Sequence, residues 1–107
     1  MKPLFLLLSF FLSIMSYSQT VEIPDKNFEK ALIDLKIDSD QTVNGKILKS
    51  DVLKVVFLDI SGKKIKNLKG IEAFTSLIFL DCSNNPLTYL DISQNIGLTA
   101  FSVISIM

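Results

Sequence analysis

The sequence predicts an α/β solenoid, in which each repeat adds one short strand to a parallel sheet and returns through a second arm. Apolar residues recur with a period of about 21 residues through the second half of the chain. Around each strand position they alternate with polar residues, as in a half-buried strand. The residues before this region follow a helical pattern instead, so we expect a helical cap at the N-terminal end of the sheet.

The segment 77–87 carries the signature of a leucine-rich repeat. It fits the pattern L-x-x-L-x-C-x-x-N-x-L at every fixed position, with Cys82 and Asn85 in the cysteine and asparagine places. The matching apolar positions of the neighbouring repeats are Val55, Leu58, Ile60, Ile65 and Leu68 before it, and Leu98, Phe101 and Val103 after it. We therefore predict a repeat region over 55–107, divided into 55–76, 77–97 and a partial repeat 98–107.

Two repeats depart from the asparagine rule. Lys63 takes that place in the first repeat and Ile106 in the third. The tail 101–107 has no turn, return arm or polar cap, and an uncapped strand exposes its backbone edge. The sequence thus leaves two expectations open: self-association through the C-terminal edge, or a truncated, non-functional fragment of a longer repeat protein.

The N-terminal segment 1–18 has the pattern of a secretory signal peptide. Lys2 precedes an apolar run of about a dozen residues, and small residues at Ser16 and Ser18 suit cleavage before Gln19. The run is too short for a membrane span, which needs about 20 residues. We expect an exported protein, extracellular or on the surface of a bacterium. Its single cysteine, Cys82, allows no internal disulfide, so apolar packing must stabilise it.

Residues 19–54 predict the helical cap. Pro24 and Asp25 indicate a helix start with Asp25 as N-cap, and the segment Ser50–Leu53 a short second helix capped by Ser50. An apolar helix face is expected from Phe28, Ala31, Leu32 and Leu35.

The loop between these helices resembles a degraded EF-hand calcium loop. Gly45 takes the sixth place and Ile47 the eighth of a twelve-residue pattern that begins at Asp40. The candidate ligand positions are Asp40, Thr42, Asn44, Lys46 and Asp51. With only two carboxylates, the expected calcium affinity is weak, about 10⁻³ M. The alternative is a polar loop in which Gly45 makes the turn and Ile47 enters the core.

Composition argues against several function classes. The net charge is +0, so no overall field attracts nucleic acid, and the chain contains neither histidine nor arginine. No nucleophile elbow or phosphate-binding loop occurs. We therefore expect no enzyme activity and, apart from weak calcium, no cofactor.

The order of these parts resembles the secreted bacterial leucine-rich-repeat proteins related to internalins. The matching phrases are Ile23-Pro24-Asp25 with Asn27-Phe28, the segment 70–77, Leu80-Asp81-Cys82-Ser83-Asn84-Asn85, and Leu90-Asp91-Ile92-Ser93-Gln94-Asn95. The resemblance implies an extracellular solenoid that binds protein or glycan ligands on its concave sheet.

In this chain that face, the outward strand face, consists of residues that alternate with the core positions. They are Phe57, Asp59, Ser61, Phe79, Asp81 and Ser83. Aromatic anchors beside aspartates suit recognition. The alternative is that the two phenylalanines only pack along the sheet.

Overall fold

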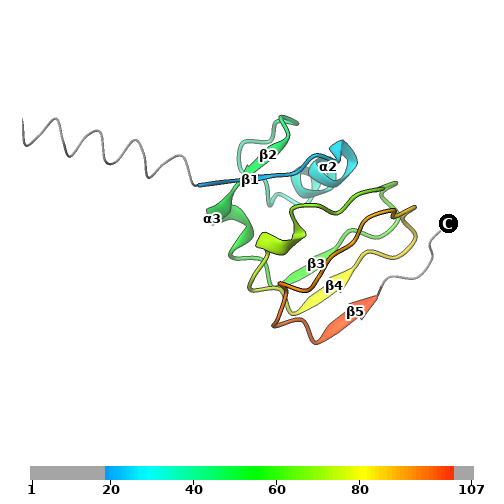
Figure 1. The fold of residues 1–107 in the computed structure, drawn as a ribbon. Helices are drawn as coiled ribbons and strands as arrows, with labels where there is room; N and C mark the ends of the chain where they lie inside the picture. Colours follow the sequence, from blue (N-terminus) through cyan, green and yellow to red (C-terminus); the bar gives the residue numbers. More distant parts are fainter. Residues whose placement is uncertain (1–18, 103–107) are drawn as a thin grey trace, which may run out of the picture.

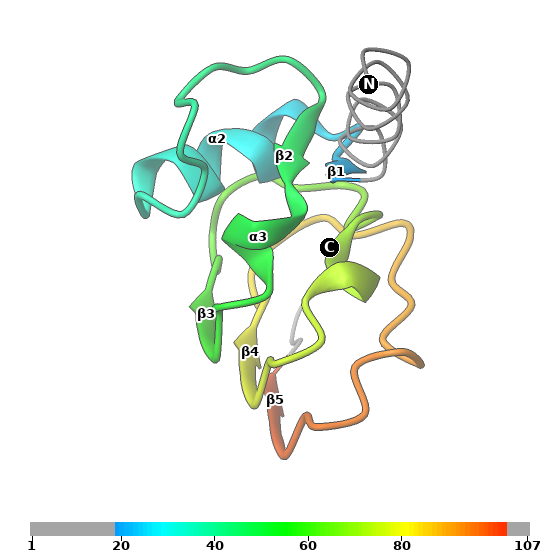
Figure 2. The ribbon, with the colours of Figure 1, turned by 90° about the vertical axis from the view of Figure 1, so that its left-hand side faces the viewer.

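The computed structural model describes residues 19–102. The expected signal peptide, and the tail 103–107 with its uncapped edge, lie outside the described residues. Three short strands form one parallel sheet in the order β3-β4-β5. Figure 1 shows the three strands side by side, and Figure 2 shows residues 19–54, the N-terminal unit, at the β3 end of this sheet. The strands are β3 (Phe57–Asp59), β4 (Phe79–Asp81) and β5 (Ala100–Ser102).

The register of the sheet follows the repeat. Leu58 pairs with Leu80 and Leu80 with Phe101, and the flanking residues pair in step. The predicted alignment of the three repeats is therefore confirmed. The returning arms of the first two repeats also make a parallel contact, an isolated bridge between Asn67 and Tyr89. It joins residues with the same spacing in sequence as the pairs between β3 and β4.

Inward strand positions and returning arms enclose one apolar core. Leu58 and Leu80 are fully buried, and the returning arm of the first repeat contains the short 3-10 helix η1 (Ile71–Ala73). The other buried apolar residues of the repeats are Val55, Ile60, Ile65, Leu68, Ile71, Phe74, Leu77 and Cys82. Burying each side chain of this size contributes roughly 1.5–3 kcal/mol to stability. This apolar packing stabilises the fold without an internal disulfide.

Asn85 organises the turns after the strands. Its Oδ1 accepts hydrogen bonds from the backbone N–H of Lys63 (2.9 Å) and Ile65 (3.0 Å) in the preceding repeat. Its Nδ2 donates to the carbonyl oxygens of Ile60 (2.9 Å) and Cys82 (3.0 Å). One buried amide therefore satisfies backbone groups in two consecutive turns, as the repeat motif predicts.

The N-terminal unit combines two helices with a hairpin-like pair of strands. Strand β1 (Thr20–Glu22) pairs antiparallel with β2 (Lys46–Leu48), which the sequence analysis did not predict. Helix α2 (Lys26–Asp34) begins at Asp25, whose Oδ1 accepts from the N–H groups of Asn27 (2.9 Å) and Phe28 (3.2 Å). The predicted N-cap is therefore confirmed.

Two details of the predicted helices are wrong. Leu35 does not join the buried face of α2, because it follows the last helical turn and is 45% exposed. Helix α3 (Lys49–Val52) has Leu48 at its N-cap with no side-chain cap, so Ser50 lies inside the helix. Strand β2 runs directly into α3, and Lys49 N donates to Gln19 O at 2.6 Å, which fixes the entry without a polar cap.

The N-terminal unit and the repeats share a single core. Phe28 of α2 stacks on Phe74 of the first repeat, with ring centroids 6.2 Å apart. Ile23 packs over Gly70, whose φ of 109° lies in the left-handed region that favours glycine. A Cβ at Gly70 would lie 2.8 Å from the carbonyl oxygen of Glu22, so only glycine allows this close approach.

Candidate functional site

The outward strand face presents an aromatic pair. Phe57 of β3 and Phe79 of β4 stand opposite each other in the sheet register, and their rings stack with centroids 4.4 Å apart at 13°. Phe57 is 64% exposed, whereas Phe79 is half-buried. The sequence placed both residues correctly on this face. Their stacking is favourable, yet most of the Phe57 ring remains in water.

The aspartates and serines of this face are engaged with each other. Asp59 Oδ1 accepts from Ser61 N (3.1 Å) and Ser61 Oγ (2.7 Å). Asp81 Oδ1 accepts from Ser83 N (3.0 Å) and Ser83 Oγ (2.6 Å). Hydrogen bonds from Ser61 hold the pKa of the Asp59 carboxyl below its usual range, so it stays ionised near neutral pH.

The same aspartate–serine pair recurs away from the face. Asp91 Oδ1 accepts from Ser93 N (3.0 Å) and Ser93 Oγ (2.7 Å) in the returning arm of the second repeat. This arrangement is therefore a turn device of the repeat, in which the side chain bonds to the backbone two residues on. At Asp59 and Asp81 it leaves Oδ2 as the oxygen for any ligand.

A hollow of about 340 Å³ extends the face beyond the predicted residues. It is lined by Leu35, Ile37, Lys54, Val55, Val56, Phe57 and Asp59. Leu35 and Val56 expose large parts of their side chains, so the apolar surface of Phe57 continues into this hollow. The sequence does not reveal this hollow, because the helical spacing places Leu35 in the core.

The predicted calcium loop is held largely by its own side chains. Asp40 Oδ1 accepts from Thr42 N (2.9 Å) and its Oδ2 from Asn44 Nδ2 (3.0 Å). Asn44 Oδ1 accepts from Lys46 N at 3.2 Å. Asp51 binds the N–H and hydroxyl of neighbouring Ser39 at 3.0 and 2.8 Å.

Two acidic residues that the sequence analysis did not single out lie under this loop. Glu29 is fully buried and accepts from Gly45 N (2.8 Å) and Asn44 N (3.1 Å). Asp38 is also buried, and its Oδ2 has no hydrogen-bond partner. Within residues 19–102, no three histidine, cysteine or acidic side chains are grouped as a metal site would require. Calcium binding by this loop stays a prediction.

Cys82 lies in the core, at the inward position after β4. It is 1% exposed, and burial raises the pKa of its thiol to about 11. The reactive thiolate is therefore scarce at neutral pH. This agrees with the packing role that the repeat pattern assigns to it.

No helix within residues 19–102 has the length and apolar character needed to cross a bilayer. No family model and no curated protein sequence matches the chain.

Solved structures do match. A functional domain of InlJ from Listeria monocytogenes, described as including a cysteine ladder, is 30% identical, with a TM-score of 0.63 over 76% of this chain and 18% of its own. The internalin InlF from Listeria monocytogenes is 23% identical, with a TM-score of 0.64 over 76% of this chain and 24% of its own, and it supports the fold alone.

A third match is a structure of ZmpB from Clostridium perfringens that contains CBM51-2 in complex with GlcNAc, and INT domains. It is 26% identical, with a TM-score of 0.62 over 77% of this chain. The present chain spans only 17% to 24% of the length of these three proteins. Together with the confirmed repeat register, these matches show that the chain has an internalin-like leucine-rich-repeat fold.

Proposed function

We propose that this protein is a non-catalytic binding module that acts outside the bacterial cell and recognises a protein or glycan through its outward strand face. The observation that carries the proposal is the stacked pair of Phe57 and Phe79, with Phe57 64% exposed. The signal-like N-terminus supports export, and the similarity to internalins supports a binding role.

Packing along the sheet is the competing explanation for the pair. Aromatic stacking contributes about 0.5–1.5 kcal/mol beyond simple burial. If Phe57 served only to pack on Phe79, burial of the rest of its ring would stabilise the protein further. Instead, most of the Phe57 ring lies in water beside an apolar hollow. Contiguous exposed apolar surface with a polar rim is typical of interaction sites. Here Lys54 and Asp59 supply that rim.

The hollow beside Phe57 suits an anchor side chain or ring from the ligand. Binding energy in interfaces concentrates where one apolar group fills a pocket and excludes water. Leu35 and Val56 would contact such a group, while Asp59 Oδ2 would accept a hydrogen bond and set its orientation. A full interface of about 800 Å² per partner would extend across the neighbouring strands.

Serine substitutions test the proposal. The protein is tested against a glycan array and a panel of purified extracellular proteins, and the retained ligand is then quantified with each variant. Phe57→Ser and Phe79→Ser should each weaken capture about tenfold or more, because each removes part of the anchor surface. Ile96→Ser is the matched control, since Ile96 is 91% exposed and lies outside the strands. Folded Phe57→Ser protein that captures the ligand as well as wild type would contradict the proposal.

We also propose a second, structural function for the acidic loop, weak calcium binding at Asp40, Thr42, Asn44, Lys46 and Asp51. The buried Asp38 Oδ2 without a partner supports it, because a nearby cation would offset the exclusion of that oxygen from water. A ligand of the native state must raise the melting temperature. Calcium up to about 10 mM should therefore stabilise the wild type and not Asp40→Asn, with magnesium as the ionic control. An unchanged melting temperature in calcium would end this idea.

A further inference from the structure

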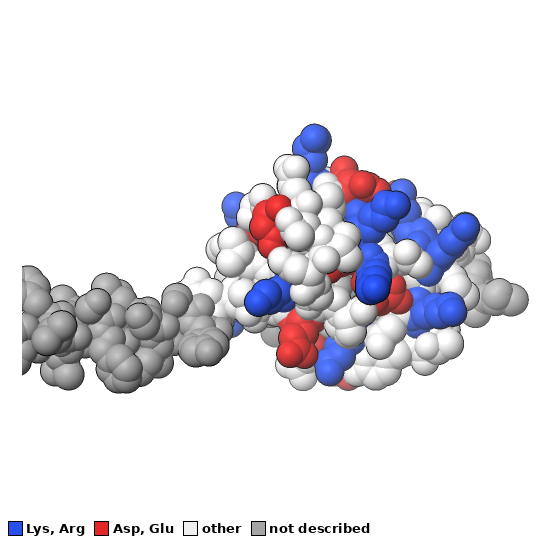
Figure 3. All heavy atoms as spheres, turned by 90° about the horizontal axis from the view of Figure 1, so that it is seen from above, with Lys and Arg blue, Asp and Glu red and all other residues white. Residues whose placement is uncertain are grey.

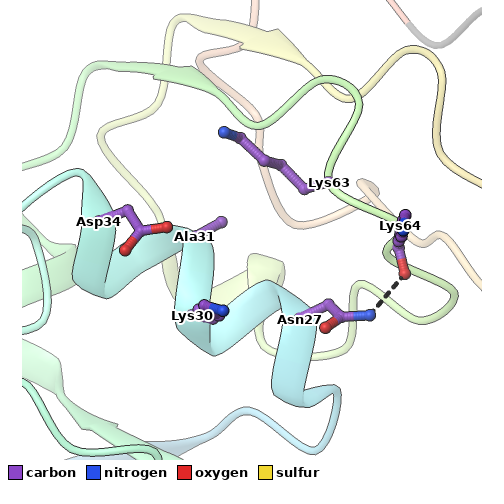
Figure 4. A pocket seen from close by; sticks show the side chains of 6 residues that line it. All are labelled: Asn27, Lys30, Ala31, Asp34, Lys63 and Lys64. Carbon is purple, nitrogen blue, oxygen red and sulfur yellow. Dashed lines mark hydrogen bonds between the residues drawn. The ribbon is translucent and has the colours of Figure 1, made fainter.

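A second hollow lies between helix α2 and the turn that follows β3, away from the outward strand face. Its volume is about 340 Å³, and it is lined by Asn27, Lys30, Ala31, Asp34, Lys63 and Lys64. Figure 4 shows Lys63 reaching from the turn toward the C-terminal half of α2, and Asn27 facing Lys64 across the other end. None of these residues belongs to the predicted sites.

The charge of this hollow is strongly positive. Lys30, Lys63 and Lys64 bring three ammonium groups, and Asp34 is the single carboxylate among the lining residues. Within the described part of the chain, none of these four groups forms an ion pair. Seen from above, the molecule presents several lysine side chains with acidic side chains among them (Figure 3). The potential here is therefore locally positive although the whole chain is neutral.

The backbone around the hollow is fixed from both sides. Asn27 Nδ2 donates to Lys64 O at 2.9 Å, which ties α2 to the turn. From the other side, Asn85 Oδ1 accepts from Lys63 N and Ile65 N. The backbone of Lys63 and Lys64 is therefore held in place beside helix α2.

The residues at this turn fit the repeat pattern less well than their counterparts one repeat later. Lys63 stands where the second repeat has Asn85, the residue that bonds two turns. Lys64 has a φ of 60°, a left-handed conformation that is unfavourable for lysine, whereas its counterpart Pro86 cannot adopt it. Departures from local structural rules concentrate at functional sites.

We propose that this hollow binds an oxyanion, namely a carboxylate, sulfate or phosphate group carried by a ligand. Three lysines around one cavity match a compact negative charge, and the chain has no arginine for planar, bidentate recognition. The volume lies at the small end of ligand pockets, so it suits the charged group itself or a single sugar ring that carries it. The site is separate from the outward strand face and does not rest on the proposed function.

Titration of the ¹⁵N-labelled protein with sodium sulfate, sodium phosphate and sodium glucuronate tests this site. Ionic strength is held constant with sodium chloride, because exposed charges are screened by salt. The expected result is a saturable shift of the backbone amides of Asn27, Lys64 and Ile65. The anion that saturates at the lowest concentration identifies the preferred chemistry.

Variants of opposite sign sharpen the test. Lys30→Gln and Lys63→Gln should each weaken binding about threefold, and Asp34→Asn should strengthen it by a similar factor, as expected for single exposed charges. Lys69→Gln is the matched control, since Lys69 is exposed and outside the hollow. Shifts that grow linearly without saturation, or that are equal in all variants, would overturn the proposal.

Discussion

The N-terminal unit and the repeats hold their turns with different side chains. In the N-terminal unit these are carboxylates: Glu29 receives two backbone N–H groups of the acidic loop, and Asp25 receives four in all. In the repeats, amides join one turn to the next: Asn85 binds the strand-side turns, and Asn95 Nδ2 donates to Ile71 O (2.9 Å) and Phe74 O (3.0 Å) around η1, whereas the aspartate–serine pairs stay within a single turn.

The difference follows from what each turn offers. A carboxylate only accepts hydrogen bonds, so it suits places where several N–H groups converge. An amide donates and accepts, and stacked turns present carbonyl oxygens and N–H groups together. The repeat can therefore propagate through asparagine, while the N-terminal unit, which follows no earlier repeat, uses acids.

Asp25 joins the two systems. In the second repeat, Thr88 N and Tyr89 N donate to the carbonyl oxygen of Lys66 at 2.7 and 3.3 Å. Lys66 and Asn67 occupy the same positions in the first repeat. Their N–H groups donate to Asp25 Oδ2, at 2.8 and 2.9 Å, in place of a carbonyl oxygen from a preceding repeat. The carboxylate oxygen takes the place of a backbone carbonyl and begins the ladder.

Loss of the repeat amide should have the largest effect. Asn85→Ala should lower the free energy of unfolding by about 4 kcal/mol, because it leaves buried backbone groups in two turns without partners. Chemical denaturation measures the change. Asn85→Asp should be no better than alanine, since its second oxygen would face the carbonyls of Ile60 and Cys82. A stable Asn85→Asp protein would break the contrast between amides and acids.

Removal of the starting carboxylate comes next. Asp25→Ala should destabilise the protein by about 2–3 kcal/mol, because it removes the cap of α2 and the acceptor for two N–H groups of the first repeat. Asp34→Ala, an exposed change on the same helix, should stay within about 0.5 kcal/mol. Equal stability of both variants in urea would show that Asp25 Oδ2 is dispensable.

The acidic unit should also respond to pH. Burial, together with the neighbouring Asp40, raises the pKa of the Asp38 carboxyl to about 7 in the folded protein, above its ordinary value near 4. The folded state then binds the extra proton between these values, so this group lowers stability as pH rises from about 4 to about 7. Melting temperatures across this range should fall less steeply in Asp38→Asn. Identical profiles would refute the assignment.

Restoring the repeat asparagine should have the smallest effect. Lys63→Asn matches the pattern of the second repeat, yet no earlier repeat offers the turn that Asn85 finds in its neighbour. We expect a change in unfolding free energy within about 0.5 kcal/mol. Calorimetry measures this change. An increase of about 2 kcal/mol in unfolding free energy, the size expected for two new buried hydrogen bonds, would contradict this expectation. It would mean that backbone groups of the N-terminal unit bond to an asparagine at position 63.

The repeat half was predictable because its signals are periodic. The spacing of Leu58, Leu80 and Phe101 fixed the strand register, and Asn85 its turns, without any knowledge of the N-terminal unit. The outward positions of Phe57 and Phe79 follow directly from the alternation along each strand.

The N-terminal unit was less predictable because its contacts are not periodic. Strands β1 and β2 pair across the whole of α2 and the acidic loop, so no short hairpin turn in the sequence indicates that they are neighbours. The second oxygen of Asp25 likewise acts on Lys66, in a different part of the chain. The two hollows escaped prediction for the same reason, since Leu35 and Lys63 acquire their roles only from neighbours in space.

The role of Asp25 has a practical consequence for engineering. An artificial array needs an acceptor for the first two N–H groups of its first returning arm, and in this chain the Asp25 carboxylate supplies it. An array begun with residues 19–54 would therefore also need a glycine at the Gly70 position to admit Ile23 and an aromatic ring at the Phe74 position to pack on Phe28.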